Sequence, residues 1–302
     1  MIKYSKIEQC SKLEDIMKNN NIAIVTDTNS GIKKEEADRL GIFLLPMPFI
    51  IDGKTYFEDV DLSSENFYKY LENDADISTS QPSLGDVIDL WDEILKTYET
   101  IIHIPMSSSL SGSMESARML SQDYNGKVLV IDNQRISISQ RQAVYDAVHW
   151  KNEGLSAQKI KENLEKTALN SSIYLTVEHL KYLKKGGRIT PAVAAIGTVL
   201  NIKPILQIQT GKIEPFKKSR GQKAAWKEMV KQIKKDIQTR FNDISIQIYA
   251  AYSGSYESGQ EWVRFVQDSF PDYNVYGTDL PLSIATHTGP GVCGIACVAK
   301  YE

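Results

Sequence analysis

Short apolar runs alternate with amphipathic segments along the first half of the chain. Residues 22–27, 101–106 and 128–131 are apolar runs that end in polar turns, a pattern typical of buried strands. Residues 84–98 repeat their large apolar side chains at helical spacing and predict a helix. Further helices are predicted over residues 33–40, 64–73, 114–120 and about 139–152. This β-α-β-α order predicts a mostly parallel sheet covered by helices.

One longer apolar stretch, residues 43–51, is predicted as a single strand that enters a hairpin turn at Asp52-Gly53. The pattern changes near residue 170. Residues 205–208 and 213–216 predict a second hairpin, split by Thr210-Gly211. Further strands are predicted over residues 173–177, 244–252 and 292–298, and helices over 156–169, 180–185, 191–200, 224–237 and 261–270. This mixture predicts a mixed α/β unit in the second half.

The change of pattern predicts an α/β fold in two domains, residues 21–169 and 170–302. Residues 1–20 precede the first strand. Their apolar side chains fall at helical spacing, which predicts a short N-terminal helical extension.

Composition places the chain among ordinary soluble globular proteins, with 302 residues, 42% hydrophobic and 24% charged. The net charge of −3 gives no general basic field for nucleic acid. No apolar run approaches the ~20 residues of a membrane span, and the polar start lacks a signal-peptide core. Three cysteines form no disulfide pattern, and Cys293 and Cys297 are predicted to be buried structural thiols. A cytoplasmic location follows as the expectation.

The most distinctive chemistry lies in Ser107–Ser113, where five serines in seven residues join an apolar strand to a helix. The first N–H groups of a helix have no partners within the helix, so a helix start is suited to binding an anion. A serine-rich capped turn with no ligand is the alternative at this point.

Several catalytic motifs are absent or out of context. Gly289–Gly294 matches G-x-G-x-x-G, but the chain ends eight residues later and no dinucleotide-binding helix can follow. The sequence contains no Walker A motif, no G-x-S-x-G elbow and no His-Glu-x-x-His motif. We therefore expect neither an α/β-hydrolase nor a zinc site.

Three other polar segments share the character of the serine turn. Residues 78–83 precede the helix predicted at Leu84 and so are expected at a helix start. Residues 184–189 end a helix with Gly186-Gly187 and a basic tip, and residues 286–291 are expected to form a glycine-rich turn. In this order and spacing, the segments resemble the DegV family. The resemblance covers nearly the whole chain, and its marks are Val25-Thr26-Asp27, Thr79–Pro82, Ser107–Gly112, Ala117-Arg118, Leu183–Ile189, Leu200–Pro204, Arg220-Gly221 and His287–Gly291.

The resemblance implies a two-domain α/β fold that holds one long-chain fatty acid between the domains. Such proteins are the non-catalytic, fatty-acid-carrying subunit of a bacterial fatty acid kinase, whose catalytic subunit phosphorylates the bound carboxylate to an acyl phosphate for phospholipid synthesis. By motif, Thr79, Ser111 and His287 match the residues that bind the carboxylate, and Arg188 matches an arginine near the site entrance and the partner surface. Neither a metal nor a cofactor is implied beyond the fatty acid. Ser113 and Met114 stand where a Thr-Tyr pair is common, which predicts a changed wall near the head group.

The residues themselves leave two alternatives. Ser111 as nucleophile and His287 as base would make a hydrolase or acyltransferase, although no third triad member is identified. The same helix starts would also suit a different anionic metabolite. A local concentration of basic residues at Lys184, Lys185, Arg188, Lys217, Lys218, Arg220 and Lys223 is either a docking patch for an acidic partner or a solvated face.

Overall fold

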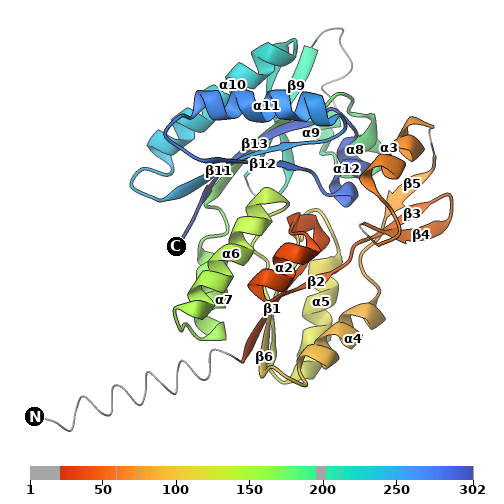
Figure 1. Ribbon diagram of the computed structural model, residues 1–302, viewed down its shortest axis with the longest axis vertical. Coiled ribbons are helices and arrows are strands. Elements are labelled where there is room, and N and C mark those ends of the chain that lie inside the picture. Colours follow the sequence, from red (N-terminus) through yellow and green to blue (C-terminus); the bar gives the residue numbers. More distant parts are fainter. Residues whose placement is uncertain (1–20, 59, 74, 195–201, 210, 302) are drawn as a thin grey trace, which may run out of the picture.

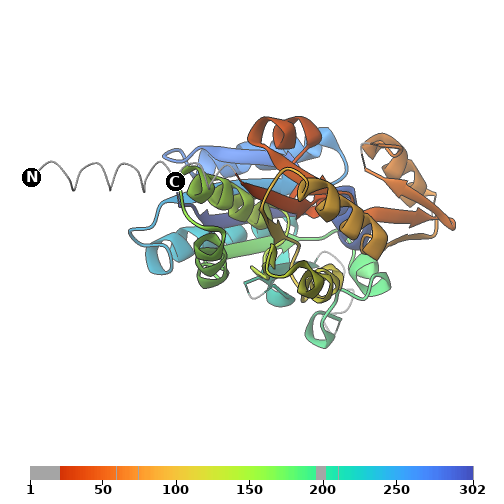
Figure 2. The same cartoon turned by 90° about the horizontal axis from the view of Figure 1, so that it is seen from below.

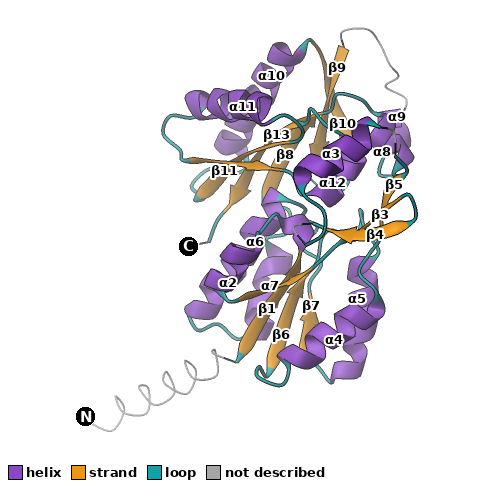
Figure 3. Ribbon diagram, turned by 45° about the vertical axis from the view of Figure 1, so that its right-hand side comes forward, coloured by secondary structure: helices purple, strands orange, loops and turns teal. Residues whose placement is uncertain are grey.

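The computed structural model of the protein describes residues 21–58, 60–73, 75–194, 202–209 and 211–301. Two sheets carry most of the chain, and Figure 1 shows the N-terminal sheet below the C-terminal one. Helices lie against the faces of both sheets (Figure 3). The architecture is α/β, as the sequence pattern predicts.

The N-terminal sheet has the order β2-β1-β6-β7, and each of its three strand pairs is parallel. Its strands are β1 (Ile22–Asp27), β2 (Ile42–Leu45), β6 (Thr100–Ile104) and β7 (Val128–Val130). β1 is buried along its whole length, which explains why it reads as a continuous apolar run.

Helices cover this sheet on both faces through two separate apolar clusters. One cluster includes side chains of α2 (Lys34–Leu40), α6 (Ile138–Asn152) and α7 (Ala157–Lys166). The other includes α4 (Leu84–Ile94) and α5 (Ser113–Ser121). Two short 3-10 helices, η1 (Thr28–Ser30) and η2 (Gln122–Tyr124), follow β1 and α5.

The C-terminal sheet has the order β10-β9-β8-β13-β11-β12. Its strands are β8 (Ser171–Thr176), β9 (Ile202–Ile208), β10 (Ile213–Arg220), β11 (Ile246–Tyr252), β12 (Val275–Asp279) and β13 (Cys293–Ala299). All pairs are antiparallel except β11 with β12, so the sheet is mixed, as predicted. The hairpin of β9 and β10 is the one that the sequence predicts.

The two faces of the C-terminal sheet have different neighbours. On one face, α10 (Gln222–Thr239) and α11 (Tyr256–Ser269) pack through a cluster that includes Trp226 and Trp262. On the other, β-strand residues join Met47, Met106 and Leu110 of the N-terminal half in one apolar cluster. The core of the second sheet is therefore continuous with residues that follow β2 and β6 of the first sheet.

The predicted single strand over residues 43–51 is wrong. The structure divides it into β2, in the parallel sheet, and β3 (Pro48–Ile51), which pairs with β4 (Lys54–Phe57) and β5 (Ile77–Thr79). Pro46 and Pro48 lie at the break, and proline cannot donate a hydrogen bond to a sheet. With α3 (Ser64–Glu72), this hairpin forms a small unit that projects from one side (Figure 2).

Three short helices complete the described chain: α8 (Lys181–Lys185), α9 (Pro191–Ala194) and α12 (Leu282–Thr288). The helix predicted over residues 191–200 begins as expected, and residues 195–200 lie outside the described residues, as does the extension predicted over residues 1–20. The domain division at residue 169 stays a prediction. Within the described part of the chain, no helix is long and apolar enough to cross a membrane.

Candidate ligand-binding site

A cavity of about 220 Å³ lies where the two halves of the chain meet. Thr79, Ser111, Arg188 and His287, the four residues predicted from the sequence, all line it. They come from four segments that are far apart in the chain. The structure therefore brings every predicted site residue to one place.

Thr79 and His287 contact each other directly, with Thr79 Oγ1 2.7 Å from His287 Nε2. Thr79 ends β5 and pairs with Phe49 of β3. The expectation that it lies at a helix start is wrong, because Ser83 caps α4 and accepts from Asp86 N. β5 was missed from the sequence because it has three residues and only one of them is a large apolar residue.

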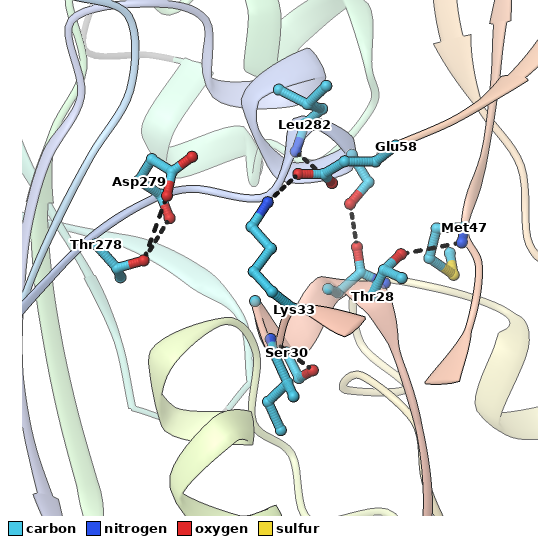
Figure 4. A network of polar contacts seen from close by, with 12 residues as sticks. Thr28, Ser30, Lys33, Met47, Glu58, Thr278, Asp279 and Leu282 are labelled. Carbon is cyan, nitrogen blue, oxygen red and sulfur yellow. Dashed lines mark hydrogen bonds and ion pairs between the residues drawn. The ribbon is translucent and has the colours of Figure 1, made fainter. Parts of the chain in front are cut away.

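His287 lies in α12, so the turn predicted over residues 286–291 begins later, at Gly289. Pro281 immediately before α12 and Gly289 immediately after it are helix boundary signals that the sequence contained. Glu58 of the projecting hairpin accepts from Leu282 N at 3.0 Å and pairs with Lys33 at 3.1 Å (Figure 4). A distant carboxylate thus satisfies the first N–H of the helix that carries His287.

The imidazole of His287 is neutral at physiological pH. Burial, together with the nearby positive charge of Arg188, lowers its pKa to about 4. Its Nδ1 is buried and has no hydrogen-bond partner among the described residues. The proton is therefore best placed on Nε2, where it can be donated to Thr79 Oγ1, and the Thr79 hydroxyl keeps its own hydrogen for an anion.

Ser113 supports the Ser111 hydroxyl by hydrogen bonding, as His287 supports Thr79. Ser111 Oγ accepts from Ser113 N at 3.2 Å and lies 2.8 Å from Ser113 Oγ. When Ser113 donates, the Ser111 hydroxyl is free to donate into the cavity. Met114 is buried in the N-terminal core and does not line the cavity, so of the two unusual residues only Ser113 bears on the site.

The remaining serines of the turn organise its backbone. Ser107 O accepts from Leu110 N and Ser111 N, and its Oγ accepts from Ser109 N. Ser108 contacts Asp132. These contacts agree with the interpretation that most of the turn is structural and that Ser111 is the side chain facing the cavity.

Arg188 connects the tip of α8 to the serine turn. Its Nε donates to Leu110 O at 3.2 Å, and its Nη1 donates to Gly186 O at 2.6 Å. Among the described lining residues it is the one cationic side chain. It lies at the site, partly exposed, and these two bonds hold the guanidinium beside His287.

The cavity continues into an apolar space. A neighbouring cavity of about 60 Å³ shares Ile136, Ile213, Ile284 and Thr288 with the first. The rest of its lining is almost entirely aliphatic and includes Ile173, Leu175, Ile208, Ala251, Leu280 and Val292. The combined space is polar at one end and apolar at the other.

The geometry does not form a hydrolase dyad. His287 contacts Thr79 rather than Ser111, and the Ser111 hydroxyl contacts Ser113. Among the described residues no carboxylate bonds Nδ1 of His287, so no third group orients it as a base.

Asn29 is a site residue that the sequence reasoning missed. It is buried, lines the cavity, accepts from Ser283 of α12 and donates to Met106 Sδ at 2.9 Å. The signal was available, because Asn29 follows directly on the predicted first strand, at the carboxyl edge where ligands bind in α/β folds.

A second cavity, of about 320 Å³, lies beside α2 and β2 and shares no lining residue with the first. Four of its charged residues form ion pairs with one another, Lys33 with Glu58 and Lys34 with Asp38. We therefore assign the ligand site to the first cavity. Its Thr79 and Ser111 hydroxyls indicate a ligand with a polar group, and the apolar space beside them indicates a ligand with an apolar part.

Fold and cavity together define an α/β protein with a parallel and a mixed sheet and an internal amphipathic cavity between them. The chain belongs to the DegV family, an uncharacterised protein family that it matches over residues 21–300. A DegV domain-containing protein of Staphylococcus aureus (strain N315) is 32% identical over 279 residues, which are 92% of this chain and 98% of that protein.

Solved structures of the family have the same fold. A DegV family protein of Thermus thermophilus, described by its fatty acid binding, aligns with a TM-score of 0.84 and 29% identity over 92% of this chain and 99% of that one. DegV of Bacillus subtilis, described as a fatty acid binding protein, aligns with a TM-score of 0.83 and 28% identity over 93% of this chain and 99% of that one.

Proposed function

We propose that this protein binds one long-chain fatty acid, with its carboxylate at Thr79 and Ser111 and its tail in the aliphatic space beyond Ile136. The observation that carries the proposal is the amphipathic cavity itself: two supported hydroxyls at one end and aliphatic walls at the other. A wholly polar metabolite would leave those walls unmatched. The fatty acid binding of the T. thermophilus and B. subtilis relatives supports the same ligand class.

The two ends of the ligand contribute differently to binding. Hydrogen bonds from neutral hydroxyls to a carboxylate are worth about 1.5–3 kcal/mol each. Burial of the tail contributes roughly 0.8 kcal/mol for each CH₂, so sixteen carbons offer on the order of 10 kcal/mol before ordering costs. The tail therefore supplies most of the affinity, and the hydroxyls set the position of the head group.

We further propose that the bound carboxylate is presented to a fatty acid kinase and that this chain has no catalysis of its own. Neutral hydroxyls hold a carboxylate less tightly than a bidentate arginine would, which leaves it reactive toward a phosphoryl donor. Arg188, partly exposed beside His287, is the residue that we assign to the contact with the kinase. Within the described part of the chain, the Ser111 hydroxyl bonds Ser113 and His287 bonds Thr79, so Ser111 has no base beside it, which supports a carrier rather than an enzyme.

Lipid extraction of the purified protein, followed by mass spectrometry, tests the binding proposal. We expect about one fatty acid per chain, and delipidated protein should bind added palmitate or oleate in calorimetry. The absence of both bound lipid and binding of added fatty acid would refute the proposal. Turnover of an acyl ester that is lost in Ser111→Ala would instead establish the hydrolase alternative.

The kinase proposal needs a separate assay with a fatty acid kinase, ATP and the loaded protein. Acyl phosphate should form only when both proteins are present. Arg188→Ala should reduce that rate more than it reduces palmitate affinity, and an equal loss of both would show that Arg188 serves the cavity rather than the partner. Lys235→Ala, which removes an exposed charge outside both this basic group and the cavity lining, is the matched control.

A further inference from the structure

Two adjacent glycines end α8, and different physical requirements explain them. Gly187 has φ +69°, a left-handed conformation that favours glycine, and open space surrounds the position of a Cβ. Gly186 has φ −76° and ψ −8°, an ordinary helical conformation that any residue adopts. The backbone therefore does not explain the glycine at position 186.

The neighbouring ring of His287 does explain it. A Cβ on Gly186 would lie 2.0 Å from His287 Nδ1 and 2.9 Å from Cε1, far inside contact distance. The ring cannot retreat without losing its other contact, the 2.7 Å hydrogen bond to Thr79. The imidazole is held between the backbone of α8 and the hydroxyl of Thr79.

The approach of α8 to α12 is close at a second point as well. A Cβ on Gly289, at the end of α12, would lie 2.2 Å from Tyr182 Cδ2 of α8. Each helix thus meets a ring of the other through a glycine. This reciprocal contact fixes the spacing of the two helices.

The contact at Gly186 also covers one nitrogen of the ring. His287 Nδ1 is buried and has no hydrogen-bond partner among the described residues, while Nε2 has Thr79. A covered nitrogen that lacks an acceptor is best left unprotonated, because a buried N–H without a partner is costly. Backbone contact at Nδ1 therefore favours the tautomer that is protonated on Nε2.

We propose that Gly186 is a positioning residue for His287. Because it has no side chain, Gly186 lets the imidazole ring lie against Thr79 and keeps the ring proton on Nε2. The proposal rests on the proposed function, in which Thr79 donates to the fatty-acid carboxylate. A side chain at position 186 would push the ring away, so that Thr79 loses the donor behind it.

The test compares Gly186→Ala with Gly85→Ala, a change in α4 that meets only an ordinary contact, in delipidated protein. Long-range ¹H–¹⁵N spectra of the imidazole rings identify the tautomer, and His287→Gln assigns the His287 signal among four histidines. We expect wild type and Gly85→Ala to show His287 protonated on Nε2, and Gly186→Ala to show a shifted signal with mixed tautomers. An unchanged His287 signal in Gly186→Ala would overturn the proposal, whether or not the protein binds lipid.

Palmitate affinity supplies the second measurement. Gly186→Ala should weaken binding about tenfold, as expected for loss of one hydrogen bond that supports a charged group. In a His287→Ala background the same change should have no further effect, because the ring that it displaces is gone. A further loss in that background would show that Gly186 acts elsewhere.

Folding failure is also informative. If Gly186→Ala does not fold but the double variant with His287→Ala does, the clash with the ring is established. If both fail, the glycine is required for another reason and the proposal is wrong. Failure of wild type to bind palmitate would refute the proposed function while leaving the ring spectra to decide the position of His287.

Discussion

The two ends of the cavity are built on different principles. At the polar end, two hydroxyl side chains face the cavity, and each has a hydrogen-bonding partner behind it: His287 for Thr79 and Ser113 for Ser111. At the apolar end, aliphatic residues of several strands form a wall in which no single group is distinguished. Binding at the polar end depends on individual hydrogen-bond partners, and binding at the apolar end depends on the total area buried. We therefore expect a single substitution to reduce fatty-acid affinity strongly at the polar end and weakly at the apolar end.

The largest expected effect needs no mutation. Octanoate has eight fewer carbons than palmitate, and at roughly 0.8 kcal/mol for each methylene its affinity should be at least about 1000-fold lower. Calorimetry over a series of chain lengths measures this. A series whose affinity does not change with length would show that the apolar end contributes little.

Removal of one hydroxyl at the polar end should have the next largest effect. Thr79→Val preserves shape but removes the donor, and we expect palmitate affinity to fall ten- to hundredfold. Thr79→Ser, which keeps the hydroxyl, should stay within a fewfold of wild type. Equal losses in both variants would indicate packing rather than hydrogen bonding.

Acid should destabilise the protein through the polar end. The pKa of His287 is about 4 in the fold, below its ordinary value near 6.5, so the unfolded chain binds more protons between these pH values. Stability is therefore full above about pH 6.5 and is lost as pH falls toward 4. The shift corresponds to about 3 kcal/mol before solvent screening, and we expect about 2 kcal/mol.

Urea unfolding of delipidated protein at several pH values tests this, with His287→Gln compared with wild type. His287→Gln should flatten the pH dependence of the free energy of unfolding. Some pH dependence of the free energy of unfolding should remain in this variant, because burial also lowers the pKa of His103 to about 3. Identical profiles for wild type and His287→Gln would contradict the assignment.

The smallest expected effect lies at the apolar end. A Cβ on Gly294 would lie 3.7 Å from Leu175 Cβ, an ordinary contact, so Gly294→Ala should fold and narrow the tail space. Affinity for stearate should fall threefold to tenfold relative to laurate. Gly85→Ala, on α4, is the control, and a uniform loss for both chain lengths would argue against a tail in this space.

The sequence predicted most elements because local pattern determines them. β1 and β6 are buried apolar runs, and α4 carries an apolar stripe on one face. One failure falls where context decides: the three residues of β5 form a strand by pairing with β3 and leave little local signal. The other two had local signals that the prediction did not use, Pro46 and Pro48 at the break between β2 and β3, and Pro281 and Gly289 at the ends of α12.

The sequence by itself determined the α/β class, the membership in the DegV family and the identity of Thr79, Ser111, Arg188 and His287 as candidates. Only the tertiary structure decided that His287 supports Thr79 and that Ser113 supports Ser111. It also decided that Gly186 must lack a side chain, since the ring that requires this lies about 100 positions further along the chain. Periodicity and motifs record what a residue does with its neighbours in sequence, whereas a hydrogen bond or a steric contact depends on which distant segments the fold brings together.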